Sequence, residues 1–440
     1  MVFSTAALHD LLKALPQPPC YWIAYSGGRD SHVLLHAMAA LSDRLNQPLR
    51  AIHINHGLQS AAIGWEAHCL ATCKDLAVPL EIIRLELSPK RGESLEALAR
   101  DGRYGAIRGL IKAGELLLTA HHQDDQAETL LLQLLRGAGP AGLGAMPRLD
   151  KFGAGFRARP LLGFCRDELA DYATEQQLNW IEDASNLDLS FDRNYLRNEL
   201  FPLLQTRWPG VARTFSRSAS HCAESHHLVE AQAAQELGGL RGSIEGTLDI
   251  PRLLLLPRDR IRAVLRYWIT SSGFSLPSTV KLNYIIDEVI HADEERSPLL
   301  QWSGAEVRRY RKHLYLMTPL TEVDADQVVV IEPDISWRLS PGMGEFKLLA
   351  GEGGIDPRLL SGEALQIRYR PLNSRLHIQG RPHSSRFKNY YQERGIPPWM
   401  RGRLPLLYAG DQLVAVADLS ICHPFGIGDG RQGLLPSWKR

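Results

Sequence analysis

Residues 26–31 read Ser-Gly-Gly-Arg-Asp-Ser, a combination suited to binding phosphate. The apolar run Tyr21–Tyr25 predicts a strand before it, and the apolar spacing across Ser31–Leu41 predicts a helix after it. A strand, a glycine-rich turn and a helix N-terminus direct backbone N–H groups at one small volume, which favours an anion. The Gly-Lys-Ser/Thr ending of a Walker loop is missing, and a plain tight turn is the alternative. The residues predicted to bind the phosphates are Ser26, Gly27, Gly28, Arg29, Asp30 and Ser31.

A second set of polar residues, His121–Thr129, follows an apolar strand, Glu115–Ala120. Asp125 and Glu128 are three residues apart and share one helix face. Carboxylates there could hold magnesium on the phosphates or clamp a cationic substrate. The alternative is structural, with Asp124 as the helix N-cap and Glu128 as its capping-box partner. Both sets follow strands of one predicted parallel sheet, so we expect them to converge at its carboxyl edge.

Two weaker candidates flank this edge. His56, in the run 53–57 after another strand, could contact adenine or ribose, or could satisfy the local backbone. Arg100 and Arg103 share a helix face and suit phosphate or carboxylate groups, although a solvated charged face is the usual explanation for such a pair. The glycine-rich segment 136–147 is predicted to be a mobile lid or a nucleic-acid contact.

Arg193 and Arg197 lie on one predicted helix face in a polar segment that also contains Glu182 and Asp183. Structural ion pairing would explain this arrangement. A polar wall facing a ligand would explain it equally well, and both interpretations stay open.

Composition excludes several protein classes. The chain has 440 residues, 44% hydrophobic and 22% charged, which is typical of a globular protein with two or three domains. No apolar run approaches the about 20 residues that cross a bilayer. The N-terminus lacks a signal-peptide pattern, and the six cysteines form no C-x-x-C pair. We therefore expect a cytoplasmic location.

The first 200 or so residues alternate strands with helical patterns, which predicts an α/β fold with a doubly wound parallel sheet. From about Thr206 to Met317 the pattern is helical, and beyond it short strands alternate with Gly and Pro. We predict a catalytic domain at 1–212, a helical domain at 213–322 and a small α+β domain at 323–440. The strands expected in the first domain are Tyr21–Tyr25, Leu49–Ile54, Leu80–Leu85 and Leu116–Ala120, and the helices are Ser31–Leu41, Trp65–Leu76, Ser94–Ile111 and Asp125–Leu135.

The net charge is only +1, but residues 366–403 hold nine Lys and Arg against one acid, Glu393. Aromatic residues lie between them. A basic surface neutralises phosphates and aromatic rings stack on bases, so this stretch predicts nucleic-acid binding more than a solvated face. The aromatic residues are Tyr369, Phe387, Tyr390, Tyr391 and Trp399.

The phosphate-loop motif resembles that of N-type ATP pyrophosphatases, the PP-loop superfamily. Taken together, the motifs resemble the tRNA(Ile)-lysidine synthetase family over most of the chain. One departure is Arg368–Asn373, which lacks the Gly-Gly often found there and leaves that local turn in doubt. The segments that carry the resemblance are 26–31, 53–57 with Trp65, 96–104, 121–129, 137–147, 159–162, 182–186, 193–198, 387–388, 396–399 and 404–408.

The resemblance implies an enzyme that modifies the wobble cytidine of a CAU-anticodon tRNA(Ile). ATP adenylates the 2-carbonyl oxygen of cytosine, and the amino group of free L-lysine then displaces AMP, which leaves lysidine. The tRNA changes its codon from AUG to AUA and its identity from methionine to isoleucine. The implied cofactors are ATP and Mg²⁺. No stable protein partner is needed, although a homodimer is possible.

Residue roles follow from the same resemblance. The serines and glycines of the phosphate loop would grip pyrophosphate, and Asp30 would hold Mg²⁺. Asp125 and Glu128 would receive the ammonium groups of lysine, with Glu128 or a neighbour taking the proton as the amine attacks. The residues that would offset charge on ATP, tRNA and the lysine carboxylate are Arg100, Arg103, Arg193 and Arg197.

Two rival functions remain. A PP-loop tRNA thiolase needs paired cysteines, and the cysteines of this chain lie outside the motifs. A non-enzymatic RNA-binding protein would not need the carboxylates Asp30, Asp125 and Glu128.

Overall fold

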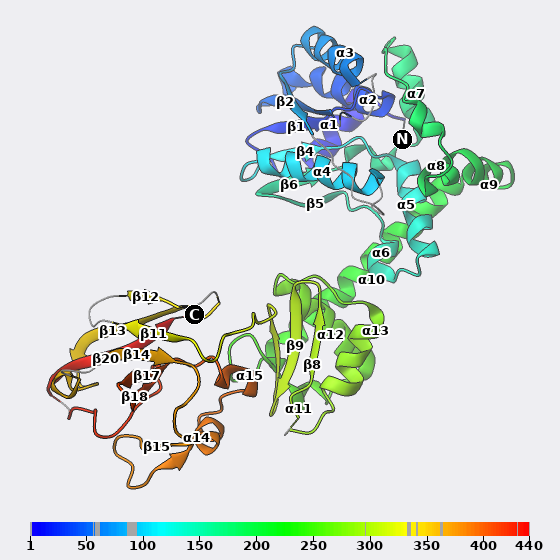
Figure 1. Cartoon of the computed structure of the whole chain (residues 1–440). Coiled ribbons are helices and arrows are strands. Elements are labelled where there is room, and N and C mark those ends of the chain that lie inside the picture. Colours follow the sequence, from blue (N-terminus) through cyan, green and yellow to red (C-terminus); the bar gives the residue numbers. More distant parts are fainter. Residues whose placement is uncertain are drawn as a thin grey trace. The chain divides into compact units, whose positions relative to one another are not determined.

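The computed structural model describes residues 2–439 except 56, 58–61, 86–94, 295, 332–335, 340–341, 361–363 and 429. The chain divides into two compact units, Met1–Val229 and Glu230–Arg440. Figure 1 labels many of the helices and strands of the two units. Among the described residues, no helix combines the length and the apolar character needed to cross a membrane.

A six-stranded sheet forms the centre of the first unit, in the order β3-β2-β1-β4-β6-β5. All neighbouring strands are parallel except β5, which pairs antiparallel with β6. The predicted doubly wound sheet is confirmed, and the four predicted strands are its first four. The strands are β1 (Tyr21–Ala24), β2 (Leu49–Asn55), β3 (Leu80–Arg84), β4 (Leu116–Leu118), β5 (Leu149–Phe152) and β6 (Gly155–Ala158).

The helices of this unit also include the four that were predicted. They are α1 (Thr5–Lys13), α2 (Arg29–Ala39), α3 (Ala62–Asp75), α4 (Leu95–Leu110), α5 (Gln123–Leu135), α6 (Pro140–Leu143), α7 (Arg166–Glu175), α8 (Asp192–Tyr195) and α9 (Phe201–Arg207). Short 3₁₀ or π turns complete them: η1 (Ser42–Arg44), η2 (Pro160–Gly163), η3 (Ala184–Leu187) and η4 (Leu196–Leu200).

Helices cover both faces of the sheet, and the alternation along β1 shows why. Tyr21 and Ile23 pack into a large apolar core with side chains of α1, α2, α3 and α7. Trp22 points to the opposite face and packs with Ile107 of α4. Successive residues of a strand face opposite sides, so a strand with no polar position must be covered twice.

The strand order determines where the predicted ligand-binding residues lie. The chain winds outward from β1 through β2 to β3, then crosses back to form β4 on the other side of β1. Residues after β1 and after β4 therefore emerge side by side at the carboxyl edge of the sheet. Such a switch point is where open α/β sheets bind ligands.

Helix α10 (Val211–Leu240) runs from the first unit into the second. Beyond it, α11 (Ile250–Leu253), α12 (Arg258–Ser271), α13 (Thr279–Tyr284) and η5 (Ile285–Val289) form a core with a four-stranded sheet. Its strands are β7 (Leu248–Asp249), β8 (Leu299–Trp302), β9 (Ala305–Tyr310) and β10 (His313–Met317). The prediction that the helical pattern continues to Met317 is wrong over 299–317. There, residues that include several with a high strand propensity pair as antiparallel strands.

The C-terminal part is α+β, as predicted. A five-stranded sheet and a three-stranded sheet share one apolar core, and helix α14 packs on a neighbouring core. Its helices are η6 (Pro357–Leu359), α14 (Phe387–Glu393) and α15 (Pro398–Arg401). Its strands are β11 (Val328–Ile331), β12 (Ser336–Arg338), β13 (Glu345–Glu352), β14 (Leu365–Arg368), β15 (Arg375–Leu376), β16 (Ser385–Arg386), β17 (Leu406–Ala409), β18 (Gln412–Val416), β19 (Ser420–Ile421) and β20 (Gln432–Lys439). The predicted limits of three domains stay a prediction.

Candidate active site

The conformation of the loop after β1 is fixed by hydrogen bonds of its own serines. The hydroxyls of Ser26 and Ser31 lie 3.1 Å apart, and Ser31 donates a 2.8 Å hydrogen bond to the Gly28 carbonyl. The backbone N–H groups of Ser26 and Gly28 donate to Ser31 Oγ and Ser26 Oγ, respectively. These bonds fix the curvature of the loop ahead of any ligand.

Gly27 needs to be glycine for two reasons. Its φ of +86° lies in the left-handed region that other residues rarely adopt. A Cβ atom there would lie 2.6 Å from Ile181 Cδ1, and the Ile181 N–H donates to the Gly27 carbonyl at 3.0 Å. The segment after α7 therefore packs directly against the phosphate loop.

Helix α2 begins immediately after this loop. Gly28 is its N-cap, and no side chain caps that end. Backbone N–H groups and the positive end of the helix dipole are then available to an anion. Asp30, in the first turn, pairs with the guanidinium of Arg29 at 3.0 Å.

The loop after β4 contributes a residue that sequence reasoning missed. His122 is the N-cap of α5 and is 2% exposed. Its Nε2 lies 3.4 Å from Asp30 Oδ2 and 3.4 Å from Asp125 Oδ2, and its Nδ1 lies 3.6 Å from Asp124 Oδ2. A histidine at the end of a central strand, directly before two aspartates, was the available signal.

The capping alternative for this helix is wrong. Asp125, not Glu128, accepts the backbone N–H of the N-cap residue, His122, at 3.0 Å. Asp124 instead accepts the backbone N–H of Arg166 at 2.9 Å, which ties the start of α7 to this edge.

The charges at this edge stabilise one another. Burial alone would lower the pKa of His122, but Asp125, Asp124 and Asp30 together raise it to about 10. Burial alone would raise the pKa of Asp30, but His122 and Arg29 hold it well below the usual carboxyl value. His122 is therefore an imidazolium at neutral pH, flanked by ionised carboxylates.

Asp125 and Glu128 do lie together on one face of α5, and both contact Arg197. The Arg197 Nε donates to Glu128 Oε1 at 2.7 Å, and its Nη2 donates to Asp125 Oδ1 at 2.8 Å and Glu128 Oε2 at 2.9 Å. Glu128 is 2% exposed and Asp125 9%. Burial raises the pKa of Glu128, whereas the charges of His122, His121 and Arg197 outweigh burial and lower that of Asp125.

Arg193 joins the same cluster. Its Nη2 donates to the Thr129 hydroxyl at 3.1 Å, and its Nε lies 3.6 Å from Glu128 Oε2. Both arginines thus pair with carboxylates of α5. Asp183 accepts the Ser185 N–H and Glu182 is exposed.

The glycine-rich segment is attached to helix α5. The side chain of Gln126 donates to the Met146 carbonyl and accepts the Met146 N–H, both at 2.9 Å. The buried guanidinium of Arg159 donates to the Pro147 carbonyl at 2.6 Å. The end of this segment is therefore fixed to α5 and to the residue that follows β6, while a lid or nucleic-acid role stays a prediction.

The remaining predicted residues receive less support. His56 lies outside the described residues, as does the side chain of Arg100, whose backbone belongs to α4. Arg103 lies on α4 with an exposed side chain. Among the described residues, no group of three or more His, Cys, Asp or Glu side chains is arranged to hold a metal ion.

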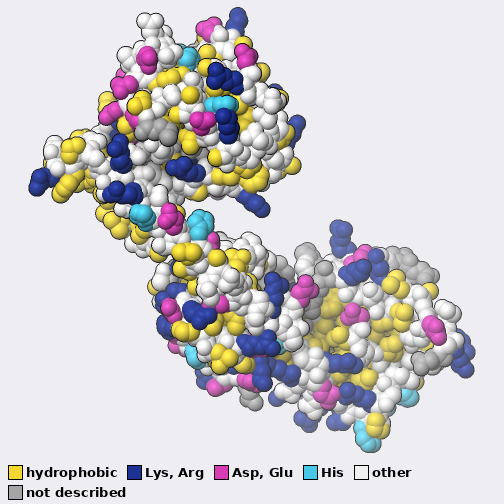
Figure 2. All heavy atoms as spheres, turned by 180° about the vertical axis from the view of Figure 1, so that it is seen from behind, with side chains coloured by type: hydrophobic (Ala, Val, Ile, Leu, Met, Phe, Trp, Pro, Cys, Tyr) yellow, Lys and Arg dark blue, Asp and Glu magenta, His cyan; other side chains and the backbone are white. Residues whose placement is uncertain are grey.

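Six of the nine cations of the basic stretch in the second unit are exposed. Dark-blue Lys and Arg side chains are spread over the face of this unit seen in Figure 2. Arg403 is an exception, 7% exposed, with its guanidinium donating to the Thr321 carbonyl. The exposed cations are Arg370, Arg375, Arg381, Arg386, Lys388 and Arg394.

The aromatic residues of this stretch do not form a stacking surface. Phe387, Tyr390 and Tyr391 are the buried face of α14, and Tyr369 is 1% exposed in a neighbouring core. The ring of Trp399 packs edge-on against Tyr315 at 5.2 Å between centroids. The prediction that these rings stack on bases is wrong for the four buried ones, because their spacing follows the inner face of a helix or strand.

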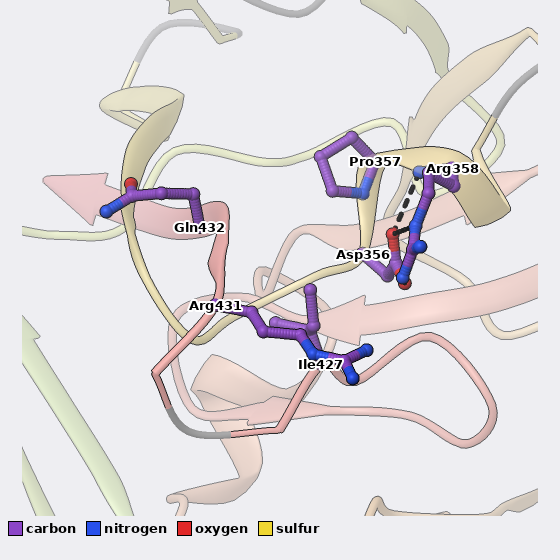
Figure 3. A pocket seen from close by; sticks show the side chains of 6 residues that line it. All are labelled: Asp356, Pro357, Arg358, Ile427, Arg431 and Gln432. Carbon is purple, nitrogen blue, oxygen red and sulfur yellow. Dashed lines mark hydrogen bonds and ion pairs between the residues drawn. The ribbon is translucent and has the colours of Figure 1, made fainter.

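A hollow of about 440 Å³ lies elsewhere in the second unit, among the loops around η6 and β20. Figure 3 shows Asp356 holding the guanidinium of Arg358 there, with Arg431 on the opposite wall. This hollow belongs to a different unit from the phosphate loop.

Comparison with known proteins matches three family descriptions: a PP-loop domain at residues 4–204, a TilS substrate binding domain at 248–315 and a TilS substrate C-terminal domain at 365–438. A tRNA(Ile)-lysidine synthase of Coxiella burnetii is 42% identical over 431 residues, covering 96% of this chain and 94% of the relative. The chain belongs to the tRNA(Ile)-lysidine synthase family. Relatives of the same name from Yersinia pseudotuberculosis (serotype O:1b, strain IP 31758) and Alkalilimnicola ehrlichii are 40% and 39% identical, covering 94% and 96% of this chain and 94% of each relative.

Membership of the lysidine synthase family confirms the resemblance drawn from the motifs. The matched PP-loop domain contains all the residues of the edge described above, from Ser26 to Arg197. The matched substrate-binding domain covers β7 to β10, and the matched C-terminal domain covers the basic stretch.

Proposed function

We propose that this protein is an ATP-dependent ligase that joins L-lysine to C2 of the wobble cytidine in CAU-anticodon tRNA(Ile). The observation that carries the proposal is the junction at β1 and β4. There an anion-binding loop and a buried acidic pair emerge side by side and are joined through His122. The family of the chain supports the same reaction.

In the first step the 2-carbonyl oxygen of cytosine attacks the α-phosphorus of ATP, and pyrophosphate leaves. The N–H groups of the phosphate loop and the start of α2 bind the departing pyrophosphate. Ser26 and Ser31 hold that loop in shape, and Arg29 adds a positive charge beside it. Charge that builds up on the leaving group is thereby stabilised.

Mg²⁺ fits this edge only if its ligands come partly from the protein and partly from the phosphates. Asp30 is ionised and partly exposed, with a side chain one-third accessible. Because Mg²⁺ usually takes one or two carboxylates together with phosphate oxygens, a single carboxylate suffices. Asp30 would hold the ion, which would neutralise phosphate charge.

In the second step the amine of lysine attacks C2, the bond from C2 to the AMP oxygen breaks, and the amine gives up a proton. We assign Asp125 and Glu128 to receive the ammonium groups of lysine. Both are bonded to Arg197, a cation like the one they would receive. Lysine therefore binds beside Arg197 or displaces it, and Arg193 or Arg197 then meets the lysine carboxylate.

Glu128 is our candidate for the proton acceptor. Burial raises its pKa towards the operating pH, which suits a general base. His122 is unsuited to that role, because its imidazole is already charged at neutral pH.

The exposed cations of the second unit are proposed to hold the tRNA body. They contact phosphates rather than bases, so they add affinity more than sequence specificity. We place the reaction in the cytoplasm, and the protein needs no stable partner, with a homodimer as a possible assembly.

The thiolase alternative is disfavoured by the cysteines. Burial raises the pKa of Cys69 and Cys73 to about 12, so both are thiols rather than thiolates. A buried thiol is a poor nucleophile and a poor metal ligand.

The deciding experiment incubates the purified protein with a CAU-anticodon tRNA(Ile) transcript, ATP and lysine. Nucleosides from the digested tRNA are then analysed by mass spectrometry. We expect cytidine with the added mass of one lysine less one water, only when ATP and lysine are both present. Incorporation of sulfur, or an unmodified cytidine, would contradict the proposal.

A further inference from the structure

Among the described residues, His122 lies within 4 Å of carboxylates of both loops, and neither step above uses it chemically. Its Nε2 lies 3.4 Å from Asp30 of the phosphate loop. It lies at the same distance from Asp125, one of the two carboxylates proposed to bind the substrate lysine. Its ring is 2% exposed, so water screens these contacts little.

Each of the two aspartates also pairs with an arginine through its other carboxylate oxygen. Asp30 pairs with Arg29 at 3.0 Å, and Asp125 accepts from Arg197 at 2.8 Å. The result is a row of alternating charges in which the imidazole is the central member. Without that ring, two carboxylates that lie against one nitrogen would face each other in a poorly hydrated space and repel.

The backbone supports the same arrangement. The His122 N–H donates to Asp125 Oδ2 at 3.0 Å, so the oxygen that faces the ring is also fixed by the main chain. His122 is the N-cap of α5, and Asp30 lies in the first turn of α2. The ring thus connects the N-termini of the two helices that carry the site.

We propose that His122 is a positioning residue that holds Asp30 and Asp125 at a fixed separation, and so fixes the phosphate loop relative to the carboxylates that bind lysine. The proposal rests on the proposed function. It deepens that function, because it makes the two half-reactions depend on one side chain that takes part in neither.

The test measures the half-reactions separately in His122→Gln. The first is tRNA-dependent pyrophosphate release without lysine. The second is lysine transfer to adenylated tRNA that the wild-type enzyme has made without lysine. The loss of the buried cation between the two carboxylates should slow release about tenfold to a hundredfold and raise the KM for lysine about tenfold.

His121→Gln is the matched control. His121 is the neighbouring residue, and its Nδ1 lies 2.9 Å from the Thr119 hydroxyl rather than against Asp30. The positioning role predicts losses in His121→Gln that are clearly smaller in both half-reactions. Equal losses in the two variants would overturn it, as would a loss in His122→Gln confined to one half-reaction.

A double variant separates positioning from general disruption. If repulsion between Asp30 and Asp125 causes the defect, adding Asp30→Asn to His122→Gln should return the KM for lysine towards the wild-type value in the second half-reaction. A structural defect would not be rescued, and absence of rescue overturns the proposal. If His122→Gln does not fold, as judged by its thermal melt, the same comparison is made with His122→Asn.

The wild-type enzyme distinguishes the two levels of failure. If it attaches no lysine to the CAU transcript, the proposed function is wrong. If it does, and His122→Gln behaves like the control, only the positioning role is wrong.

Discussion

The charged side chains at the carboxyl edge of the first unit's sheet and those of the basic stretch in the second unit are arranged in opposite ways. At the edge, buried and half-buried groups of both signs alternate within 4 Å of one another, from Arg29 through His122 to Arg197. Along the basic stretch most cations are exposed, and pairs such as Arg381 with Glu393 at 2.7 Å are open to water. Buried charges depend on their neighbours, whereas exposed charges act almost independently.

This difference leads to distinct expectations. A substitution at the edge should have a large effect that salt hardly changes. A substitution in the basic stretch should have a modest effect that salt removes.

The largest effect is expected from Asp30→Ala. Pyrophosphate release should fall by about a thousandfold or more, since the position next to the phosphates loses its carboxylate. Release is measured with tRNA and ATP, and a thermal melt checks folding. His122 keeps Asp124 and Asp125 as neighbours, so the fold should survive. A stable variant that still releases pyrophosphate at a rate near that of the wild type would remove Asp30 from the site.

Glu128→Gln and Asp125→Asn should mainly affect lysine. Each removes one charge from the pair that faces Arg197, so the lysine concentration for half-maximal transfer should rise about tenfold to a hundredfold. Adenylated tRNA should still form, which a labelled-AMP assay detects. Unchanged lysine dependence in both variants would mean that the pair serves only to bind Arg197.

The basic stretch is probed by replacing Arg386, Lys388 and Arg394 with Ala together. All three side chains are exposed. Binding of tRNA should weaken about tenfold to a hundredfold at low salt, and the slope of log K against log salt should fall by about one for each lost phosphate contact. Titrations at two salt concentrations measure both. An unchanged slope would exclude these cations from the tRNA interface, and ATP binding serves as the control.

The smallest effect is a pH dependence of stability. The folded pKa of His122, about 10, lies above its unfolded value of 6.5. Its contribution to the free energy of unfolding is therefore full below pH 6.5, declines as the pH rises, and is gone above about 10. Urea unfolding at pH 6 and pH 8 should show a larger decline in the wild type than in His122→Gln. Equal declines would mean that His122 is not charged in the fold.

The sequence was sufficient for the architecture of the edge but not for its contacts. The strand order follows from alternating patterns and crossover rules, so the meeting of residues 26–31 with residues 121–129 could be predicted. That one imidazole contacts Asp30 and Asp125 could not, because it depends on how far α2 and α5 begin from the ends of β1 and β4. The partners of Arg193 and Arg197 were missed for the same reason, since local spacing does not reveal cross-element pairs.

For the basic stretch, the prediction that aromatic rings stack on bases failed for a different reason. Phe387, Tyr390 and Tyr391 have the i, i+3, i+4 spacing of an apolar helix face, a signal present in the sequence. A count of charged residues does not distinguish a surface that stacks on bases from a buried helix face. Where aromatic residues share a helical period, burial is the first interpretation to consider.

Helix α10 has a consequence for cooperativity. Val211 and Ala212 at its start pack in a core of the first unit, while Ala233 and Leu237 near its end pack in a core of the second. Helix extension from an existing turn is far easier than nucleation, so whichever unit is folded templates part of the helix that the other needs. Melting of one unit should therefore lower the melting temperature of the other, and a glycine in place of exposed Ala231 should separate one calorimetric transition into two.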